Sequence, residues 1–386
     1  MGYVVIDHLV QGSSYGGVRI VPEISLLELQ HTARSMTYKN AFIGNKAGGA
    51  KAAVIIDRNN EQYKKEILTE FGKSISPIVR NGLYFPVMDM GIQIQDLQII
   101  FDNTKTRTNV LSWKNLSHVY TAYSCLYATL SALQVLEEIH NLNNKDVTFC
   151  VQGYGKVGSL YSYLMYKAGA KFTGFSNKYF GVMDDNGLDA EKLFNEQLKR
   201  GDDFILDLKD KQVSHDSILE KDVNVLLLAS NALVINEKNY KKIRADIIVC
   251  AANAPVSYDI ERKLFKEGKM VVTDFIANCG GILGSIMDTY LSEDAVKKIL
   301  SSSYKRKVTT LIYQSINQDT AIIDLVIDEL QKRIDSNYDD TYIQKGFTEH
   351  IIDLFNEFSL PLYMFTNNFL EKKYVSRYEK FWGPKI

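Results

Sequence analysis

Short apolar runs alternate with helix-like segments along most of the chain, which is typical of α/β proteins. The first third has four strand-like runs and two segments with apolar residues at helical spacing. The strands are predicted at Tyr3–Ile6, Gly17–Ile20, Ala52–Asp57 and Gly82–Val87, and the helices at Ile24–Tyr38 and Gln62–Ile78. Glu23 and Ser25 stand where a helix N-cap is expected. We therefore expect an N-terminal α/β domain in residues 1–118.

A long amphipathic segment follows, from Val119 to His140, and strand and helix patterns alternate beyond it. The strands are predicted at Val147–Gln152, Lys171–Ser176, Val223–Ala229, Asp246–Ala251 and Met270–Asp274, and helices at Lys156–Ala168 and Tyr258–Glu267. Such alternation predicts a parallel sheet covered by helices, which is a Rossmann-type doubly wound domain over residues 119–300. Residues 301–386 are helical and charged, and we expect them to pack back across both domains. The aromatic and basic stretch Tyr374–Ile386 is expected to dock against another domain or subunit.

Composition excludes several classes of protein. The 386 residues suffice for two domains with substantial cores, and the 45 basic and 46 acidic residues nearly cancel. Without a block of like charge, we expect neither nucleic-acid nor membrane partners. Met1–Val10 lacks the pattern of a signal peptide, and no apolar run is long enough to span a bilayer. The four cysteines are Cys125, Cys150, Cys250 and Cys279, and none forms a C-x-x-C pair. This scatter indicates reduced cysteines in the core of a cytoplasmic protein and predicts no metal site.

The segment V-Q-G-Y-G-K-V-G has a dinucleotide-binding pattern. Gly153, Gly155 and Gly158 form G-x-G-x-x-G directly after a predicted strand and at the start of a predicted helix. The first glycine allows the tight turn, the second lets the backbone approach a pyrophosphate, and the third lets the helix pack on the strand. The helix begins at Lys156 and Val157, and its free N–H groups then face the phosphates.

The strand after this fingerprint ends at Ser176-Asn177-Lys178. An NAD-preferring site usually has Asp or Glu at this point, to accept hydrogen bonds from the ribose. Asn177 can still bind the ribose but does not repel a 2′-phosphate, and Lys178 either attracts that phosphate or is an exposed loop residue. NAD and NADP therefore both stay open. Ala229, at the carboxyl end of a later strand, is a further candidate contact of the cofactor.

Two lysines lie close together around glycines in Met36–Asp57. Lys39 stands on a polar stretch, and Lys51 follows a predicted Gly48-Gly49 hinge at the mouth of an apolar strand. Two ammonium groups in a partly dry, glycine-lined pocket suit a small carboxylate substrate. One ammonium pairs with the carboxylate, whereas the other, desolvated and repelled by its neighbour, loses its proton more easily and can act as a base.

Asparagines mark the ends of two later strands. One strand is predicted to end in Asp274, after which Asn278 and two glycines open a helix, and C-A-A-N-A-P ends another strand with Asn253. Such residues lie where an open α/β sheet presents its ligand crevice, although they also serve as loop caps.

Seven motifs occur in order along residues 3 to 290. They are Y-G-G-V-R, M-T-Y-K-N, G-G-A-K, M-D-M-G, G-Y-G-K-V-G, A-N-A-P and A-N-C-G-G. With these motifs in this order, the chain resembles the Glu/Leu/Phe/Val dehydrogenases. These enzymes interconvert amino acids and 2-oxo acids with a nicotinamide cofactor. The resemblance covers most of the chain and implies an N-terminal substrate-binding and dimerisation domain, a homo-oligomer, and closure of a cleft between the domains.

The resemblance also implies roles for the matched side chains. Lys39 would bind the α-carboxylate of the substrate. Lys51 would activate water against the imine and stabilise the carbinolamine, and Asp89 would move protons to and from the amino group. Thr121, Asn253 and Asn278 would lie near the nicotinamide.

The positions that contact the substrate side chain depart from the glutamate-specific pattern. Those relatives have a lysine just before G-G-x-R, where this chain has Tyr15, so a second buried carboxylate would lack its partner. Ser285, in contrast, matches a serine of the glutamate enzymes. The predicted pocket is mainly apolar with two hydroxyls and suits a neutral side chain; it is lined by Tyr15, Val87, Ile282 and Ser285.

The sequence leaves three functions open. The first is an NAD(P)-dependent dehydrogenase that converts a neutral L-amino acid to its 2-oxo acid and ammonia. The second is a glutamate dehydrogenase with an altered side-chain site. The third is a non-catalytic relative that binds an amino acid or nucleotide as a sensor or subunit, which the loop Asn103–Ser117, without a counterpart in relatives, favours. The complete set of Lys39, Lys51 and Asp89 favours the first.

Overall fold

The computed structural model describes residues 1–57, 60–140, 147–288 and 290–336. The chain divides into two units, of which the first comprises Met1–Asn115 together with the described residues from Ile327 onward. The second unit comprises Leu116–Val326. The division falls just before the long helix, where the sequence pattern placed a boundary at residue 118. The predicted docking segment Tyr374–Ile386 lies outside the described residues.

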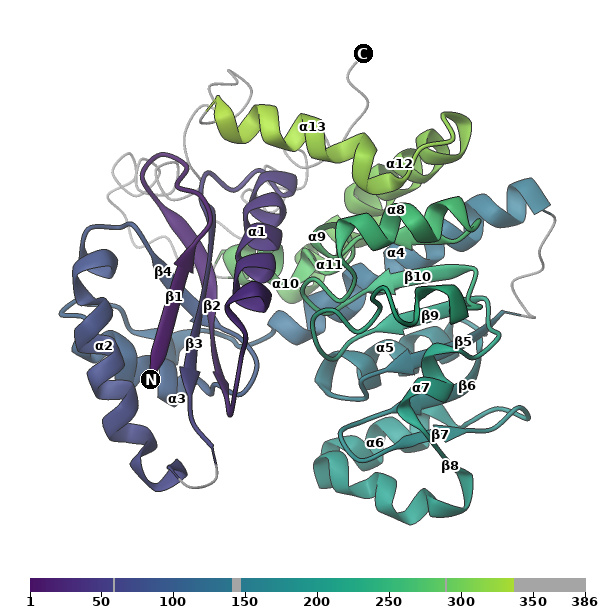
Figure 1. The fold of residues 1–386 in the computed structure, drawn as a ribbon, viewed down its shortest axis with the longest axis horizontal. Coiled ribbons are helices and arrows are strands. Elements are labelled where there is room, and N and C mark those ends of the chain that lie inside the picture. The colour runs from purple at the N-terminus through teal and green to yellow at the C-terminus, as the bar shows by residue number, and fades with distance from the viewer. Residues whose placement is uncertain (58–59, 141–146, 289, 337–386) are drawn as a thin grey trace. The chain divides into compact units, whose positions relative to one another are not determined.

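The first unit is built on a four-stranded sheet in the order β1-β3-β2-β4 (Figure 1). Its strands are β1 (Gly2–Ile6), β2 (Ser14–Val21), β3 (Gly48–Ile55) and β4 (Phe85–Met88). β2 runs parallel to β3 and β4, whereas β1 is antiparallel to β3. Its helical elements are α1 (Leu26–Phe42), η1 (Glu61–Tyr63), α2 (Lys64–Arg80), α3 (Ile94–Asn103) and η2 (Val110–Ser112).

Strand β3 begins at Gly48 and not at the predicted Ala52. Glycine and alanine are poor strand formers, so the sequence pattern missed this end. The prediction of a hinge at Gly48 and Gly49 was wrong, because both residues belong to the strand. A Cβ on Gly49 would stand 2.1 Å from the backbone nitrogen of Thr37, so the glycine lets helix α1 lie directly against β3. Lys51 is consequently an interior residue of the strand and not a residue before it.

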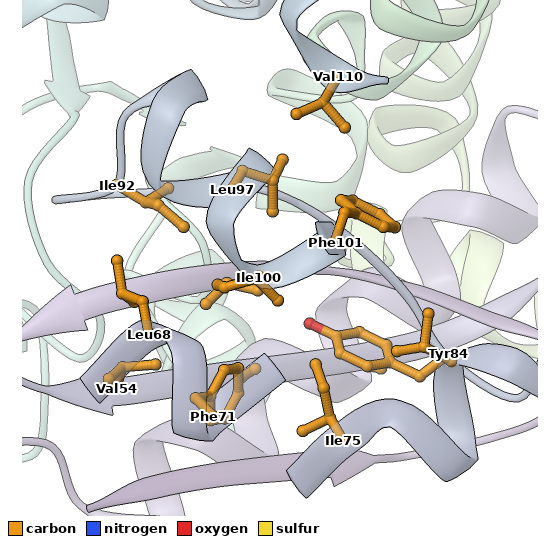
Figure 2. Packing of buried hydrophobic residues seen from close by; sticks show 14 of the residues in the cluster. Val54, Leu68, Phe71, Ile75, Tyr84, Ile92, Leu97, Ile100, Phe101 and Val110 are labelled. Atoms are coloured by element: carbon orange, nitrogen blue, oxygen red, sulfur yellow. The ribbon is translucent and has the colours of Figure 1, made fainter. Parts of the chain in front are cut away.

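One face of this sheet packs against helices α2 and α3. That core includes Val18 and Leu68, and Figure 2 shows part of it. Since side chains alternate along a strand, β2 directs Val18 into the core and Tyr15, Gly17 and Arg19 to the opposite face. The register of β2 therefore decides which of its residues lie on the face that carries Lys51.

The second unit contains a seven-stranded sheet in the order β11-β10-β9-β5-β6-β7-β8 (Figure 1). Its strands are β5 (Thr148–Gln152), β6 (Lys171–Ser176), β7 (Gly181–Met183), β8 (Gln212–Val213), β9 (Val225–Leu228), β10 (Ile247–Cys250) and β11 (Met270–Val272). The strands from β11 to β6 are parallel, which confirms the Rossmann-type prediction. β7 runs antiparallel to both of its neighbours, β6 and β8. Neither β7 nor β8 was predicted, because runs of 3 and 2 residues give no periodic signal.

The helical elements of this unit are α4 (Ser117–His140), α5 (Lys156–Lys167), α6 (Ala190–Arg200), α7 (His215–Leu219), α8 (Tyr258–Lys266), α9 (Asp274–Ala277), α10 (Gly280–Met287), α11 (Glu293–Ile299) and α12 (Lys305–Asn317), with η4 (Gly201–Lys211), η5 (Tyr240–Lys242) and η6 (Leu300–Tyr304). Helix α13 (Ile322–Asp335) begins in the second unit, and its residues from Ile327 onward belong to the first. The strand predicted to end at Asp274 stops at Val272, and Asp274 begins the short helix α9. All four cysteines are buried and free, as predicted. Among the described residues, no helix has the length and apolar character needed to cross a membrane.

Candidate active site

Lys51 and Asp89 form a buried ion pair in the first unit. Lys51 lies in β3, and Asp89 directly follows β4. The Lys51 Nζ and Asp89 Oδ2 atoms are 2.6 Å apart, and only 2% of the Lys51 side chain is exposed. These two residues are 38 positions apart in the sequence, and the pairing of β3, β2 and β4 makes them direct neighbours.

Arg19 of β2 joins this pair, although the sequence analysis gave it no role. Its Nε donates to the same Asp89 oxygen at 3.0 Å, and its Nη1 donates to Glu28 at 2.8 Å. The signal was present in the motif Y-G-G-V-R: Arg19 is two residues from Gly17, so strand alternation puts both on the face that carries Lys51.

Gly17 makes the room that this cluster needs. A Cβ at this position would lie 2.6 Å from the Cβ of Asp89 and 3.4 Å from the Nζ of Lys51. Any larger residue would therefore push Asp89 away from its two cations. A glycine is required here by the space that the neighbouring charged side chains occupy, and not by a turn of the backbone.

Lys39 comes from helix α1, which brings a third cation into the same unit. The N-cap of this helix is Ser25, whose side chain accepts from the Glu28 N–H at 3.1 Å. The polar stretch that carries Lys39 is not exposed, since the last two turns of α1 are buried and Lys39 is 3% exposed. Asn40 fixes this end of the helix by donating to the Gly48 carbonyl at 2.8 Å.

Burial and neighbouring charges decide the protonation of the cluster. Burial lowers the pKa of Lys51 to about 8; the Asp89 charge opposes this shift, while Arg19 and Lys39 add to it. Burial alone would raise the pKa of Asp89, but Lys51 and Arg19 hold it well below its usual range. Asp89 is therefore ionised at neutral pH, and Lys51 is a lysine that can release its proton near physiological pH.

Tyr15 and Val87 lie on the strands that carry this cluster. Tyr15 is on the same face of β2 as Gly17, and Val87 pairs with Gly17 across the β2–β4 ladder. Tyr15 stacks on Phe85 with ring centroids 4.9 Å apart, and Phe85 stacks on Trp113 at 6.2 Å. Trp113 belongs to the loop that has no clear counterpart in relatives, so this loop adds an aromatic ring to the row.

The glycine fingerprint lies in the second unit, between β5 and α5. Gly153 has a φ of +100°, and a Cβ there would be 2.7 Å from the backbone of Ala229. A Cβ on Gly158 would be 2.1 Å from the Gly153 carbonyl oxygen, so this glycine lets α5 start close to the strand. Gly155 instead faces open space and precedes Lys156 and Val157, the first residues of α5. Open space at the N-terminus of a helix is what a pyrophosphate requires.

Two substitutions separate the roles of these glycines. Gly153→Ala is expected to lower the free energy of unfolding by about 1–3 kcal/mol, because alanine is strained at positive φ and meets the Ala229 backbone. Gly155→Ala is expected to leave the melting temperature unchanged and to weaken NAD binding, since its φ of −89° suits alanine and only a ligand would meet the methyl group. Thermal melting and NAD titration of both variants check this; unchanged NAD affinity in Gly155→Ala would contradict it.

Asn177 follows β6 and is largely engaged within the protein. Its Nδ2 donates to the Asp202 carbonyl at 2.9 Å, and its Oδ1 accepts from the Tyr179 N–H at 2.9 Å. Lys178 is exposed and pairs with the Asp202 carboxylate at 3.4 Å. The residues at the strand end give no sign of Asp202, which η4 brings back from 25 residues along the chain.

Asn253 and Asn278 come together at the carboxyl end of β10. The Nδ2 of Asn278 donates to the Ala251 and Ala252 carbonyls at 3.1 and 3.0 Å, and lies 3.4 Å from the Asn253 Oδ1. Its Oδ1 is buried and has no hydrogen-bond partner within the described part of the chain. An unpaired buried acceptor fits the carboxamide N–H of a nicotinamide. Asp274 supports the loop by accepting from the Ala254 N–H at 2.7 Å.

Thr121, Ile282 and Ser285 lie where helices α4 and α10 meet. A Cβ on Gly281 would be 2.4 Å from the Thr121 hydroxyl oxygen, so the glycine brings the two helices into contact. Thr121 donates to the Ser117 carbonyl at 2.8 Å, and the exposed Ser285 donates to the Gly281 carbonyl at 2.7 Å. Ile282 and Ser285 thus belong to the second unit, whereas Tyr15 and Val87 belong to the first. In the described ranges, no three His, Cys, Asp or Glu side chains gather in a way that could hold a metal ion.

Known proteins match both parts of the chain. Residues 115–330 match the Glutamate/Leucine/Phenylalanine/Valine dehydrogenase family, and residues 1–106 match the dimerisation domain of the same family. An NADP(+)-dependent glutamate dehydrogenase of Pyrobaculum calidifontis is 27% identical over 74% of this chain and 72% of its own length. An NAD-specific glutamate dehydrogenase of Staphylococcus aureus is 26% identical over 82% and 80%.

Solved structures agree at the level of the fold. The hetero-hexameric glutamate dehydrogenase of Thermus thermophilus has a TM-score of 0.71 at 18% identity, over 87% of this chain and 84% of that one. The L-tryptophan dehydrogenase of Nostoc punctiforme has a TM-score of 0.59 at 19% identity, over 87% and 92%. The chain therefore belongs to the Glu/Leu/Phe/Val dehydrogenase family, enzymes that oxidise or form amino acids with NAD or NADP.

Proposed function

We propose that this protein catalyses the reversible NAD(P)-dependent oxidative deamination of a neutral L-amino acid to the 2-oxo acid and ammonia. The observation that carries the proposal is the buried pair of Lys51 and Asp89, in which a lysine with a pKa of about 8 contacts an ionised carboxylate. Exposed ion pairs contribute little to stability. The burial of this pair therefore indicates a role in the chemistry of the site.

Lys39 is the proposed partner of the substrate α-carboxylate. Lys39 is buried in the first unit, and its charge acts on Lys51, which itself binds Asp89. A substrate carboxylate beside Lys39 gains a cation in a site from which water is largely excluded, which strengthens the attraction. Binding at this end orients the α-carbon and its amino group relative to Lys51.

Lys51 and Asp89 divide the proton transfers of the reaction. In deamination, the neutral Nζ of Lys51 takes a proton from the water that attacks the imine carbon, and its charged form then stabilises the carbinolamine. Asp89 accepts a proton from the substrate ammonium and returns one to the leaving ammonia. The separation of 2.6 Å between the two groups lets each hold the other in its required orientation.

The second unit would hold the cofactor. The turn at Gly155 and the start of α5 would bind the pyrophosphate, and the unpaired Oδ1 of Asn278 would accept from the carboxamide. The bound nicotinamide supplies the hydride chemistry, whereas the protein contributes orientation and exclusion of water.

The charge balance around Tyr15 supports a neutral side chain. A substrate with a second carboxylate needs a further cation, and Arg19, on the same face of β2, already binds Asp89 and Glu28. The ring of Tyr15 stacks on Phe85, which in turn stacks on Trp113. An unpaired carboxylate buried beside these rings would be costly, whereas an apolar or aromatic side chain would gain contact area.

Glutamate is the second candidate, because the two relatives described above are glutamate dehydrogenases. Their shared substrate requires recognition of a side-chain carboxylate. Ser285 can donate one hydrogen bond, but its hydroxyl already donates to the Gly281 carbonyl. The absence of a cation at position 15 therefore places glutamate behind a neutral amino acid.

A substrate panel tests this choice. We expect NADH or NADPH formation with one or more neutral L-amino acids and little with glutamate. Tyr15→Lys is expected to raise kcat/KM for glutamate by about tenfold or more, since a charged pair at that point recovers binding energy. Tyr15→Phe is the matched control, because it keeps the ring that stacks on Phe85 and adds no cation. A wild-type enzyme that prefers glutamate would overturn the proposed specificity, and no turnover with any amino acid would overturn the proposed activity.

The same proposal includes a homo-oligomer in the cytoplasm that acts on small molecules. The match of residues 1–106 to a dimerisation domain supports self-association. β1 lies at the edge of its sheet and presents backbone groups on which a second copy can pair. Four buried free cysteines agree with a reducing compartment.

A further inference from the structure

The element η4 (Gly201–Lys211) is attached to the carboxyl end of β6 by three polar contacts. Asn177 donates to the Asp202 carbonyl at 2.9 Å, Lys178 pairs with the Asp202 carboxylate at 3.4 Å, and the Tyr179 hydroxyl donates to the Asp203 carboxylate at 2.7 Å. Two carboxylates thus stand beside the strand end, although the sequence there has only Asn and Lys. This strand end is where a Rossmann-type sheet binds the adenosine ribose.

Aromatic packing fixes the same element against the fingerprint turn. Phe204 lies 5.8 Å from the ring of Tyr154, the residue between the first two glycines, and 5.9 Å from the ring of Phe175 in β6. Tyr154 and Phe175 are themselves 4.3 Å apart. The start of η4 is therefore held against the fingerprint turn, which is proposed to bind the pyrophosphate, and against β6, whose carboxyl end is the expected ribose site.

Three cations in or beside η4 have acidic partners. Lys178 is bound to Asp202, and Arg200 is bound to Asp207 and Glu196. Lys199 lies 3.9 Å from Glu196. A 2′-phosphate would thus meet cations that have acidic partners, together with the Asp202 carboxylate next to Asn177.

We propose that Asp202 determines the nucleotide preference and makes the enzyme specific for NAD. Its carboxylate takes the place of the acidic residue that is missing at Asn177: it accepts from the ribose 2′-hydroxyl of NAD and repels the 2′-phosphate of NADP. Lys178 acts as a positioning residue that holds the carboxylate in place and partly offsets its charge. The inference rests on the proposed binding of a dinucleotide at the fingerprint, and it concerns a residue delivered by η4 and not by the strand.

Calorimetric titration of the full chain with NAD and with NADP, without amino acid, tests this assignment. We expect wild type to bind NAD at least about tenfold more tightly than NADP, since the Asp202 carboxylate and the 2′-phosphate of NADP carry like charges that repel each other. Asp202→Asn should reduce the ratio of the two dissociation constants by about tenfold, chiefly through tighter NADP binding. Lys178→Gln should change the ratio in the opposite direction, because the carboxylate is then uncompensated. Asp207→Asn is the matched control, since it removes the same charge from the same element at a residue paired with Arg200, and it should leave the ratio within about twofold of wild type.

Several results would overturn the inference. A wild type that binds NADP as tightly as NAD contradicts it, and so does an Asp202→Asn variant that binds both nucleotides with an unchanged ratio. If Asp202→Asn fails to fold, Lys178→Gln decides, and a ratio that stays constant or falls in that variant rejects the role of Asp202. Binding of both nucleotides without discrimination leaves the proposed dehydrogenase function intact, whereas binding of neither rejects both proposals.

Discussion

Replacing Lys51 with alanine is expected to lower kcat by at least about a hundredfold, the smallest effect typical of losing a general acid/base. The variant loses the amine that deprotonates the attacking water and the cation that stabilises the carbinolamine. NAD affinity should not change, because the fingerprint belongs to the second unit. Steady-state rates with the best neutral amino acid, together with NAD titration, measure both quantities.

Two further variants identify which property of Lys51 matters. Lys51→Arg keeps a positive charge but cannot release its proton, so we expect it to be nearly as inactive as the alanine variant. Lys73→Ala removes an exposed lysine that pairs with Glu70 on the same helix, and it should retain wild-type rates. Full activity in Lys51→Ala, or activity restored by arginine, would show that Lys51 is not the base.

The fold was predictable wherever local chemistry decided the structure. The fingerprint is an example, since the glycines at 153 and 158 are required by the turn and by close packing of strand and helix. The parallel strands were predictable because they are continuous apolar runs, buried on both faces of the sheet. The start of β3 was predicted too far along the chain, because the strand opens with glycines and an alanine. Their place in the strand depends on packing against α1 and not on propensity.

The site was less predictable, because it depends on contacts between distant segments. The motifs brought Lys39, Lys51 and Asp89 to attention one by one, but no spacing in the sequence shows that Arg19 binds Asp89. The same limit applies to Asp202, which reaches the end of β6 only through the corner between α6 and η4. Residues of this kind are found from strand pairing and loop packing, which a single sequence does not specify.

Replacing Asp89 with asparagine is expected to lower kcat by about a hundredfold or more and to move the pH profile toward acid. The amide has nearly the same shape but cannot carry protons to and from the amino group. In wild type, activity should rise with pH through about 8, because the neutral form of Lys51 is the base and its pKa is about 8. The negative charge of Asp89 raises that pKa, so its removal lowers it, and the rising limb of the residual activity should shift to lower pH.

The profile distinguishes this role from a structural one. Glu28→Gln is the matched control, since Glu28 is the other carboxylate bound to Arg19 and does not contact Lys51. We expect that variant to keep a rate within about tenfold of wild type and an unshifted limb. A rate of Asp89→Asn close to wild type would exclude proton transfer by this residue. A limb that moves to higher pH would show that Asp89 does not hold the proton on Lys51, because the loss of a stabilising negative charge makes a buried ammonium more acidic and not less.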